Sequence, residues 1–371
     1  MKIIHCADLH LGAALTTRMT PEQAAGRRAE LLANFGRLAD YAKTQEVQAI
    51  LIAGDLFDVR FIDSQTREYV LDVIRMHSNI DFYYLKGNHD TEDLPGPGTD
   101  HLSNLFLFKE SEWTSYQIKD SKVMISGIEI NTCGNGSGSG QIDVPVFPEG
   151  LINIAMLHGE LIAYGHGIGN DKIAVNDLIG KNIHYLALGH IHSYGSGRID
   201  GKGVWCNPGS LEGHGFDECG KHGFVMLDIY ERTGTIISEF VPFASREYHI
   251  CQADISAAGS YADIYRIIDE ALAKAGNPGS KDFVRIELTG QADVDLDISC
   301  AVIEHHLADR FTYIEVLDKS LAACNYRVLE EDQSLKGEFV RQVNASHLTE
   351  ERKAEVIKAG ITILNGGQPF S

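Results

Sequence analysis

Several features that mark common classes of protein are missing from this sequence of 371 residues. Its seven cysteines are odd in number and form no Cys-x-x-Cys pair. This pattern favours reduced, mostly buried thiols in a cytoplasm over a disulfide framework or a zinc ribbon. The longest apolar runs are strand-sized, far below the roughly 20 residues that span a bilayer. No secretory signal is visible at the start, so we expect a cytoplasmic protein without a membrane partner.

Basic residues are also scarce. Lysine and arginine together number 32 against 52 acidic residues, which gives a formal net charge of −20 at pH 7. This charge excludes a uniformly basic nucleic-acid coat, so a polyanionic substrate would need a local region of positive charge. The remaining composition, 44% hydrophobic and 23% charged, is that of an ordinary globular protein. Its length suggests two or three domains.

Strand-like apolar runs and longer amphipathic runs alternate through the first part of the chain. Strands are expected at residues 2–6, 47–53 and 81–85, and helices at 22–43 and 64–76. This alternation predicts an α/β layered sheet. In such sheets, ligands bind at the loops that follow the carboxyl ends of the strands.

The pattern changes in the second part of the chain. From Trp113 onward β-rich runs follow one another, interrupted by a glycine- and serine-rich loop at 134–140 that lacks the lysine of a phosphate-binding loop. After Pro242 strands and helices alternate again as a β-α-β-α-β block, and two helices follow Ser334. We therefore expect three domains, at residues 1–243, 244–320 and 321–371.

Five separated segments each follow a strand-like run and carry Asp, Asn or His, with glycine nearby. Strand alternation predicts that Asp8 and His10 share a face, and that His190 and His192 do likewise. The glycines allow sharp turns and a close approach of ligands. The segments are Asp-Leu-His at 8–10, Gly-Asp-Leu-Phe-Asp at 54–58, Gly-Asn-His-Asp at 87–90, Leu-His-Gly at 157–159 and Gly-His-Ile-His at 189–192.

Together these segments offer carboxylates, one amide oxygen and five imidazoles, without a thiolate. Mixed oxygen and nitrogen ligation favours manganese, iron or zinc over calcium. The number of groups exceeds what one ion needs. It predicts two divalent ions, which in such sites lie ~3.5–4 Å apart, activate a water and neutralise oxygens on phosphorus. Histidines outside the segments are expected to be ordinary core or surface residues: His77, His166, His214, His305 and His347.

In this order and context the segments resemble the calcineurin-like metallophosphoesterase superfamily, over residues 1 to about 241. The resemblance implies an α/β fold, a four-layer β-sandwich flanked by helices, followed by a smaller C-terminal α+β capping domain and a helical tail. It implies that His89 assists the leaving group while a metal-activated water attacks phosphorus, and that Asp58 orients His89. It also implies one ion held by Asp8, His10, Asp55 and His192, and a second held by Asp55, Asn88, His158 and His190.

Finer motifs at residues 3–12, 207–212 and 220–224 are similar to those of SbcD-like DNA double-strand-break repair nucleases, and among them the YhaO-type branch. This resemblance implies a DNA exonuclease or endonuclease that uses two divalent ions, Mn²⁺ with Fe or Zn as alternatives. It further implies a homodimer and an SbcC-like coiled-coil ATPase docked on the tail helices. The first tail helix could instead pack on its own domain.

The same metal centre could serve other substrates. A phosphodiesterase or phosphatase for cyclic or free nucleotides stays open, as does a non-catalytic scaffold. Val59 stands where serine/threonine protein phosphatases carry arginine, which argues against that branch. For a DNA substrate, basic residues near the segments in sequence would contact phosphates. They are Arg60, Lys86, Arg198, Lys202 and Lys221.

Overall fold

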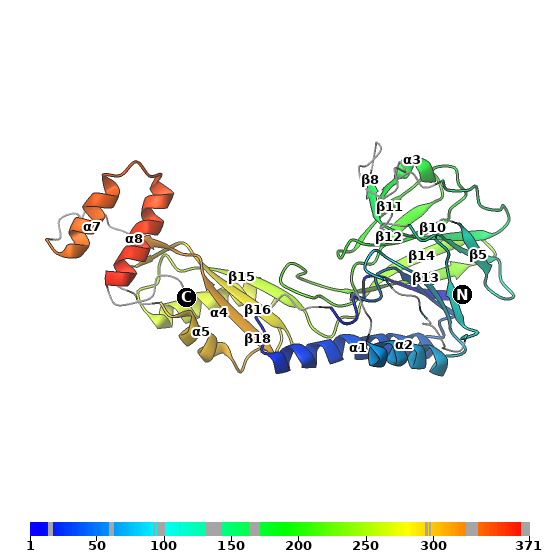
Figure 1. Ribbon diagram of the computed structural model, residues 1–371, viewed down its shortest axis with the longest axis horizontal. Coiled ribbons are helices and arrows are strands. Elements are labelled where there is room, and N and C mark those ends of the chain that lie inside the picture. Colours follow the sequence, from blue (N-terminus) through cyan, green and yellow to red (C-terminus); the bar gives the residue numbers. More distant parts are fainter. Residues whose placement is uncertain are drawn as a thin grey trace. The chain divides into compact units, whose positions relative to one another are not determined.

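The computed structural model describes residues 1–13, 18–58, 63–91, 94, 101–110, 112–130, 143–162, 171–293, 296, 298–323 and 333–364. The chain divides into two compact units, Met1–Ser245 and Arg246–Ser371 (Figure 1). The finer division into domains 1–243, 244–320 and 321–371 stays a prediction. The expected loop at 134–140 lies outside the described residues, as do Val59, Arg60 and His166.

The first unit contains two six-stranded sheets. The first sheet has, in spatial order, β14 (Thr235–Pro242), β13 (Gly223–Tyr230), β1 (Lys2–Cys6), β2 (Ala49–Ala53), β3 (Asp81–Leu85) and β4 (Leu105–Leu107). The second has β11 (Gly195–Arg198), β12 (Val204–Asn207), β10 (Tyr185–Gly189), β7 (Ile152–His158), β6 (Val123–Gly127) and β5 (Thr114–Gln117). β1 to β4 are parallel to one another, and so are β6, β7, β10 and β12. Their carboxyl ends therefore lie at one edge of each sheet.

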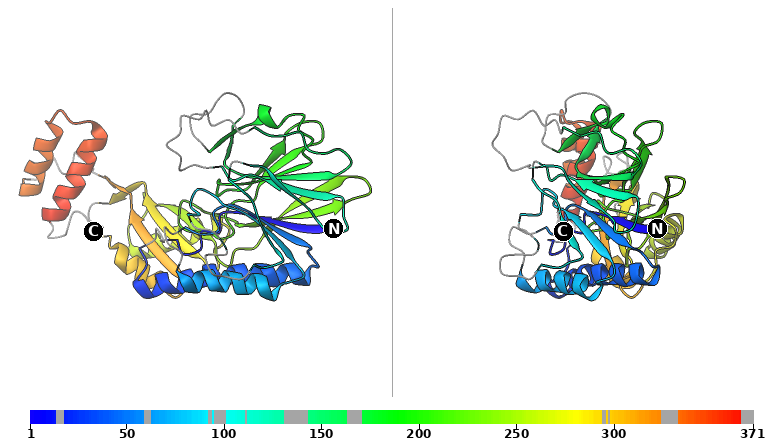
Figure 2. Two further views of the ribbon diagram at one scale, coloured as in Figure 1. Left: turned by 45° about the vertical axis from the view of Figure 1, so that its right-hand side comes forward. Right: turned by 90° about the vertical axis from the view of Figure 1, so that its right-hand side faces the viewer.

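Side chains of β1 show how the layers pack. Ile4 and Cys6 point into a core shared with the helices α1 (Pro21–Thr44) and α2 (Ser64–Met76), whereas Ile3 points into a core shared with the second sheet. A third core on the far face of the second sheet includes Leu178 of the short helix α3 (Val175–Leu178). The unit is thus a four-layer sandwich of two sheets with flanking elements, which confirms the predicted fold (Figure 2).

Local sequence explains where the two long helices start. The hydroxyl of Thr20 caps α1 by accepting from the backbone amide of Gln23, and the Gln23 side chain accepts from the backbone amide of Thr20. Pro21 occupies the first turn. Asp63 caps α2 by accepting from the backbone of Gln65 and Thr66 at 3.0 and 2.9 Å. The bounds of β1, β3 and α2 match the prediction. The short strands β4, β5 and β11 were not predicted, and neither was the pair β8 (Glu160–Ile162) and β9 (Lys172–Ala174).

The second unit contains the predicted β-α-β-α-β block. β15 (Tyr248–Asp254), β16 (Phe283–Thr289) and β18 (Tyr313–Asp318) form a parallel sheet, and α4 (Tyr261–Lys274) and α5 (Cys300–Leu307) share its core. A two-stranded sheet pairs β17 (Gln291–Asp293) with β19 (Leu321–Ala323).

The tail holds the two predicted helices, α7 (Leu335–Asn344) and α8 (Glu350–Leu364). Val340 and Val343 of α7 pack against Ile357 and Ile361 of α8. Among the described residues no helix is both long and apolar enough to cross a bilayer.

Candidate metal centre

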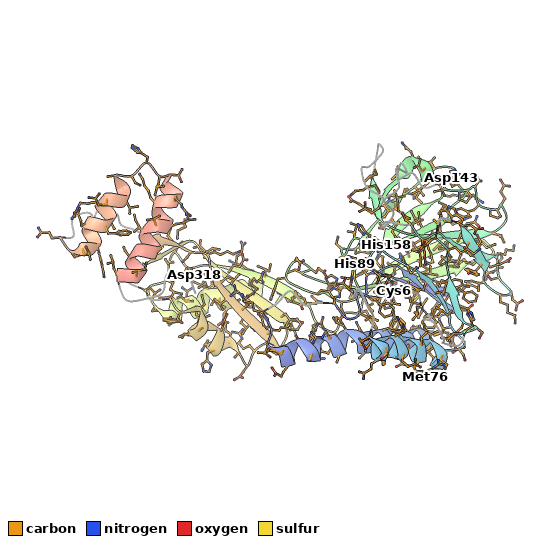
Figure 3. All side chains as sticks on the ribbon, viewed as in Figure 1. Cys6, Met76, His89, Asp143, His158 and Asp318 are labelled. Carbon is orange, nitrogen blue, oxygen red and sulfur yellow. The ribbon has the colours of Figure 1, made fainter. Side chains whose placement is uncertain are left out.

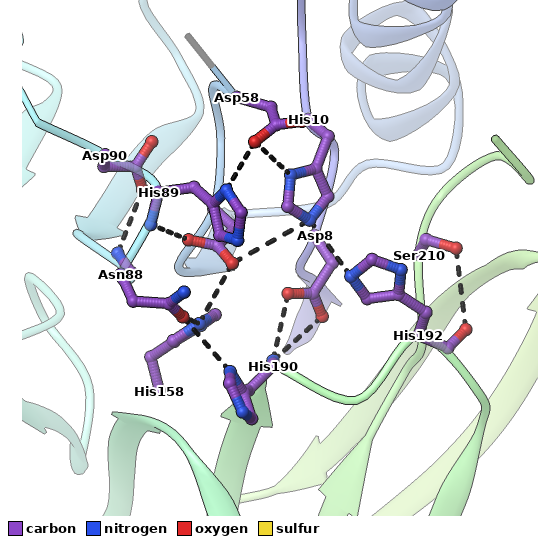
Figure 4. A network of polar contacts seen from close by, with 12 residues as sticks. Asp8, His10, Asp58, Asn88, His89, Asp90, His158, His190, His192 and Ser210 are labelled. Carbon is purple, nitrogen blue, oxygen red and sulfur yellow. Dashed lines mark hydrogen bonds and ion pairs between the residues drawn. The ribbon is translucent and has the colours of Figure 1, made fainter. Parts of the chain in front are cut away.

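All nine residues that the sequence singled out are described, and the structure brings them together in the first unit. They follow the carboxyl ends of β1, β2 and β3 in one sheet and of β7 and β10 in the other (Figures 3 and 4). Among the described residues four groups of potential ligands overlap there, each with ligand atoms within 4.8 Å of one another. They are Asp8, His10 and His192; Asp55, His158 and His190; His10, Asp58 and His89; and His192, His214 and Glu218.

The backbone of this region is unusual, because four candidate ligands have positive φ angles. They are Asp8 (52°), His10 (45°), Asp55 (50°) and His190 (101°). Each such residue costs about 1–3 kcal/mol and persists only where the surroundings hold it, which is common at functional sites. The strands end at Cys6 and Gly189, so strand alternation does not position these residues. Asp8 and His10 do belong to one ligand group, but the prediction that His190 and His192 lie together was wrong, because they belong to different groups.

Neighbouring loops hold these residues in place. The backbone amides of Asp8 and His10 donate to the carbonyls of Gly54 and Asp55 at 3.1 and 3.0 Å, which continues the parallel pairing beyond β1 and β2. Two glycines leave space for the side chains of candidate ligands. A Cβ on Gly54 would lie 2.1 Å from Nδ1 of His158, and one on Gly87 would lie 2.2 Å from Oδ1 of Asp55.

The group around His158 is arranged for a cation. Nδ1 of His158 donates to the carbonyl of Ala53 at 2.9 Å, so its Nε2 is the remaining ring nitrogen. That Nε2 faces two oxygens, Oδ1 of Asn88 at 2.9 Å and Oδ2 of Asp55 at 3.2 Å. Oδ1 of Asn88 also contacts Nδ1 of His190 at 3.1 Å.

Electrostatics agree with this geometry. Burial opposes protonation of His158, but the hydrogen bond and charge of Asp55 and the charge of Asp8 raise its pKa to about 9. Burial would raise the pKa of Asp55, but its bonds to His158 and the His89 amide lower it to about 2. A positive charge is therefore favoured between His158 and Asp55, and a divalent ion supplies one there.

The group around His10 is arranged in the same way. Nε2 of His10 lies 3.1 Å from Nε2 of His192 and 3.8 Å from Oδ2 of Asp55. Burial lowers the pKa of His10 to about 4, so this imidazole is neutral near pH 7 and can offer a lone pair. Asp8 is fully buried and accepts from the amide of His190 at 3.0 Å through both oxygens. Oδ2 of Asp55 thus lies within reach of both groups, and the donor set fits two ions.

His89 and Asp58 form a pair at the rim of the site. Nδ1 of His89 hydrogen-bonds Oδ1 of Asp58, and the His89 side chain is 47% exposed. The same Asp58 oxygen lies 3.7 Å from Nδ1 of His10, and the rings of His89 and His10 are 5.0 Å apart (Figure 4). His89 is therefore accessible to a substrate and held next to the first ligand group.

Sequence reasoning assigned no role to several residues that support the site. Asp90 is buried and accepts from the amides of Leu56, Phe57 and Gly87 at 3.2, 2.8 and 2.9 Å, which ties two ligand loops together. The sequence feature that could have identified Asp90 is its position at the end of the Gly-Asn-His-Asp segment. Asp171 lies 3.3 Å from Nε2 of His190, and nothing in the sequence marked it.

His214 was expected to be an ordinary core or surface histidine, and the structure places it buried beside the first ligand group. Its ring lies 5.5 Å from that of His10, and its Nδ1 contacts Oε2 of Glu218 at 3.2 Å. Glu218 also accepts from Nδ1 of His192 at 2.6 Å. Burial opposes ionisation of Glu218, but the bonds from both histidines hold its pKa well below the usual range. By contrast, His77 is an ordinary residue at the end of α2, bonded to the carbonyl of Val73 at 2.7 Å.

The basic residues expected to contact phosphates are mostly placed elsewhere. Nζ of Lys86 lies 3.4 Å from Glu129 and 3.6 Å from Glu110, so its charge is engaged within the protein. In the strand register, Arg198 of β11 lies opposite Val204 of β12, and Val204 lies opposite Tyr185 at the start of β10. Because β11 reverses direction, Arg198 lies about 13 Å along the strands from the ligand edge, and so does the turn that carries Lys202. Lys221 is exposed.

Comparison with protein families agrees with this geometry. The family model of the calcineurin-like phosphoesterases matches residues 1–194, a segment that contains every candidate ligand. The chain belongs to this family. It is therefore a metal-dependent phosphoesterase, and its His and Asp clusters are compatible with the dimetal centre that this family uses.

Three curated proteins are similar to parts of this chain. An uncharacterized metallophosphoesterase YhaO of Bacillus subtilis is 25% identical over 79% of this chain and 72% of its own length. The DNA double-strand break repair protein Mre11 of Sulfolobus acidocaldarius is 26% identical over 54% of this chain and 52% of its own. The SbcD component of the nuclease SbcCD of Staphylococcus saprophyticus is 32% identical over 25% of this chain and 24% of its own. The chain thus spans about half the length of the Mre11 protein and about a quarter of the SbcCD subunit.

Among solved structures, the protein TT1561 of Thermus thermophilus aligns with 64% of this chain and 98% of its own, with a TM-score of 0.38 and 12% identity. This similarity is too low to bear on function.

Proposed function

We propose that the chain is a two-metal-dependent nuclease that cleaves phosphodiester bonds of DNA. The observation that carries the metal part of this proposal is the position of Asp55. Its Oδ2 lies 3.2 Å from Nε2 of His158 and 3.8 Å from Nε2 of His10, between two groups of ligands. Asp8, His10, Asp55 and His192 would hold one ion, and Asp55, Asn88, His158 and His190 the other.

The chain's own residues account for substrate orientation and proton transfer. When bound, two divalent ions supply charge stabilisation for the attacking and leaving oxygens of phosphoryl transfer. As water attacks phosphorus and releases one proton to solvent, the phosphorus–oxygen bond to the leaving group breaks and the exposed imidazole of His89 donates a proton to the leaving oxygen. Asp58 accepts from Nδ1 of His89, so that the other ring nitrogen is directed toward the substrate.

The names of two relatives support DNA as the substrate, since Mre11 is a DNA double-strand break repair protein and SbcCD a nuclease. On this basis we propose a role in DNA repair in the cytoplasm, with manganese as the metal. The net charge of −20 implies that binding of DNA depends on the metals, which would add four positive charges at the site.

The experiment compares substrates under matched conditions. Metal-stripped protein is supplied with Mn²⁺ and given end-labelled duplex DNA, bis-p-nitrophenyl phosphate, cyclic AMP and a nucleoside monophosphate, with a chelator control. A nuclease cleaves the DNA, and its affinity for DNA falls steeply with salt because phosphate contacts release counterions. Turnover of the small esters with intact DNA at every salt concentration would falsify the nuclease assignment and favour a nucleotide phosphodiesterase or phosphatase.

We also propose that the tail docks a coiled-coil ATPase of the SbcC type and that the protein forms a homodimer. In α7, Phe339 and Val343 pack on α8, whereas Leu335 is 71% exposed and available to a partner. Removal of residues 330–371 should abolish co-purification with such an ATPase while small-ester turnover persists. Association that survives the deletion would refute docking through the tail, and a monomer in light scattering would refute the dimer.

A further inference from the structure

Glu218 lies outside the proposed ligand set, yet it contacts one member directly and a second through another histidine. The Glu218 side chain is 12% exposed, and its Oε1 accepts from Nδ1 of His192 at 2.6 Å. Its Oε2 accepts from the amide of His214 at 3.1 Å, from Nδ1 of His214 at 3.2 Å and from the hydroxyl of Ser210 at 3.2 Å. One carboxylate therefore fixes two imidazoles at once.

The bond to His192 determines which ring nitrogen can bind a metal. A carboxylate can only accept, so Nδ1 of His192 carries the proton and Nε2 carries the lone pair. That Nε2 is the atom that lies 3.1 Å from Nε2 of His10. A histidine ligand held in this way by a carboxylate has a fixed ring orientation and a more basic lone pair.

The bond to His214 extends the same control to His10. The ring of His214 packs edge-on against the ring of His10, with centroids 5.5 Å apart and planes at 85°. With Nδ1 of His214 bonded to Glu218, this ring has one orientation and limits the rotation of His10.

The loop around Glu218 is itself anchored. Nε2 of His222 donates to the carbonyl of Glu218 at 3.0 Å, and the amide of Ser210 donates to the carbonyl of His192 at 3.1 Å (Figure 4). The segment is therefore built to hold the carboxylate next to His192.

We propose that Glu218 is a positioning residue for the metal ion held by His10 and His192, acting on His192 directly and on His10 through His214. This inference rests on the proposed two-metal function. It predicts that Glu218→Gln lowers the affinity for one of the two ions and leaves the affinity for the other unchanged. In the variant an amide can donate to Nδ1 of His192, which moves the ring proton to Nε2 and removes the lone pair.

The test measures Mn²⁺ binding by calorimetry on metal-stripped wild type, Glu218→Gln and Glu212→Gln, and EPR of the loaded proteins. Glu212 is the matched control, because it is a buried glutamate of the same segment that is bonded to Arg27 and Asn34 and touches no proposed ligand. We expect Glu218→Gln to bind one ion roughly 10- to 100-fold more weakly and to lose the signal of a coupled Mn²⁺ pair. Glu212→Gln should lower stability to urea while both affinities stay at the wild-type value.

Each outcome separates the two claims. Wild type that binds fewer than two ions refutes the proposed function, whereas Glu218→Gln with two wild-type affinities refutes only the role of Glu218. If Glu218→Gln does not fold, ¹⁵N NMR of Zn²⁺-loaded wild type decides, with His192 assigned by its loss in His192→Gln. A proton on Nδ1 supports the proposal, and a proton on Nε2 overturns it.

Discussion

At the scale of single residues, His89 is the group whose removal separates chemistry from metal binding. It lies at the rim, is 47% exposed and belongs to neither proposed ligand set. We expect His89→Ala to keep both ions and to lower kcat by roughly 10²- to 10⁴-fold, the usual contribution of a general acid. Metal analysis together with steady-state turnover measures both quantities.

Controls for His89 come from the same chain. His305→Ala changes an exposed histidine of α5 in the second unit and should leave kcat at the wild-type value. Asp58→Asn should lower kcat in wild type but add little in the His89→Ala background, because the carboxylate acts through that imidazole. Additive losses would show that Asp58 has a separate role.

Gly189 shows how closely the two sheets approach at the site. A Cβ at this position would lie 2.0 Å from the carbonyl oxygen of Ala53, a backbone atom of the other sheet. We expect Gly189→Ala to lower the free energy of unfolding by about 1–3 kcal/mol, since the backbone must shift. Urea unfolding of the chelator-treated protein measures this, and Gly201→Ala, which meets nothing within 4 Å, should be close to neutral. Equal effects of the two changes would contradict the packing described.

At the scale of elements, a buried ion pair joins α1 to the segment after β12. Arg27 donates to Glu212 at 2.7 Å, and the two side chains are 1% and 3% exposed. Glu212→Gln removes the buried counter-charge of the guanidinium and leaves the more exposed Glu30 at 3.2 Å, so we expect a loss of roughly 3 kcal/mol. Arg75→Ala on α2 removes half-exposed pairs with Asp72 and Glu68 and should cost under about 1 kcal/mol. Urea unfolding that ranks the two variants the other way would exclude this role for the pair.

Elements also show what the sequence could predict and what it could not. Apolar and amphipathic runs located β1, β3 and α2, because the periodicity of buried residues is readable within a few residues of sequence. The edge strands β5 and β11 were missed because half of each faces solvent and lacks an apolar signature. The ligands were found from their segments, whereas Asp171, His214 and Glu218 were not, because their roles depend on contacts between segments.

At the scale of the whole molecule, stability should depend on pH through His5, which joins the two sheets. Its Nε2 donates to the carbonyl of Leu188 at 3.0 Å and its Nδ1 accepts from the hydroxyl of Tyr185 at 2.9 Å, so the neutral ring is fully paired. Burial lowers the pKa of His5 to about 3, opposed by the bond to Leu188.

The sign of this dependence follows from proton binding. Unfolded His5 takes up a proton near pH 6.5, but the folded residue does so only near pH 3. The contribution of His5 to the free energy of unfolding should therefore decrease as the pH is lowered from about 6.5 to about 3, by up to about 1.4 kcal/mol per pH unit. Urea unfolding at pH 7 and pH 5 in chelator should show a smaller difference for His5→Asn than for wild type. The same difference in both proteins would rule out His5 as the source.

The pairing of β1 has a consequence for the order of events during synthesis. β1 lies between β2 and β13, and His5 is paired with Val225. At ribosomal rates of 5–20 residues per second, the first strand waits roughly 10–45 s for its second neighbour. For that interval an apolar strand has one open edge, and during the earlier part of it Asp8 and His10 have no His192 beside them. The nascent chain is thus most prone to aggregation before its last sheet strands emerge, whereas the proposed ligand sets are complete as soon as His192 has been synthesised.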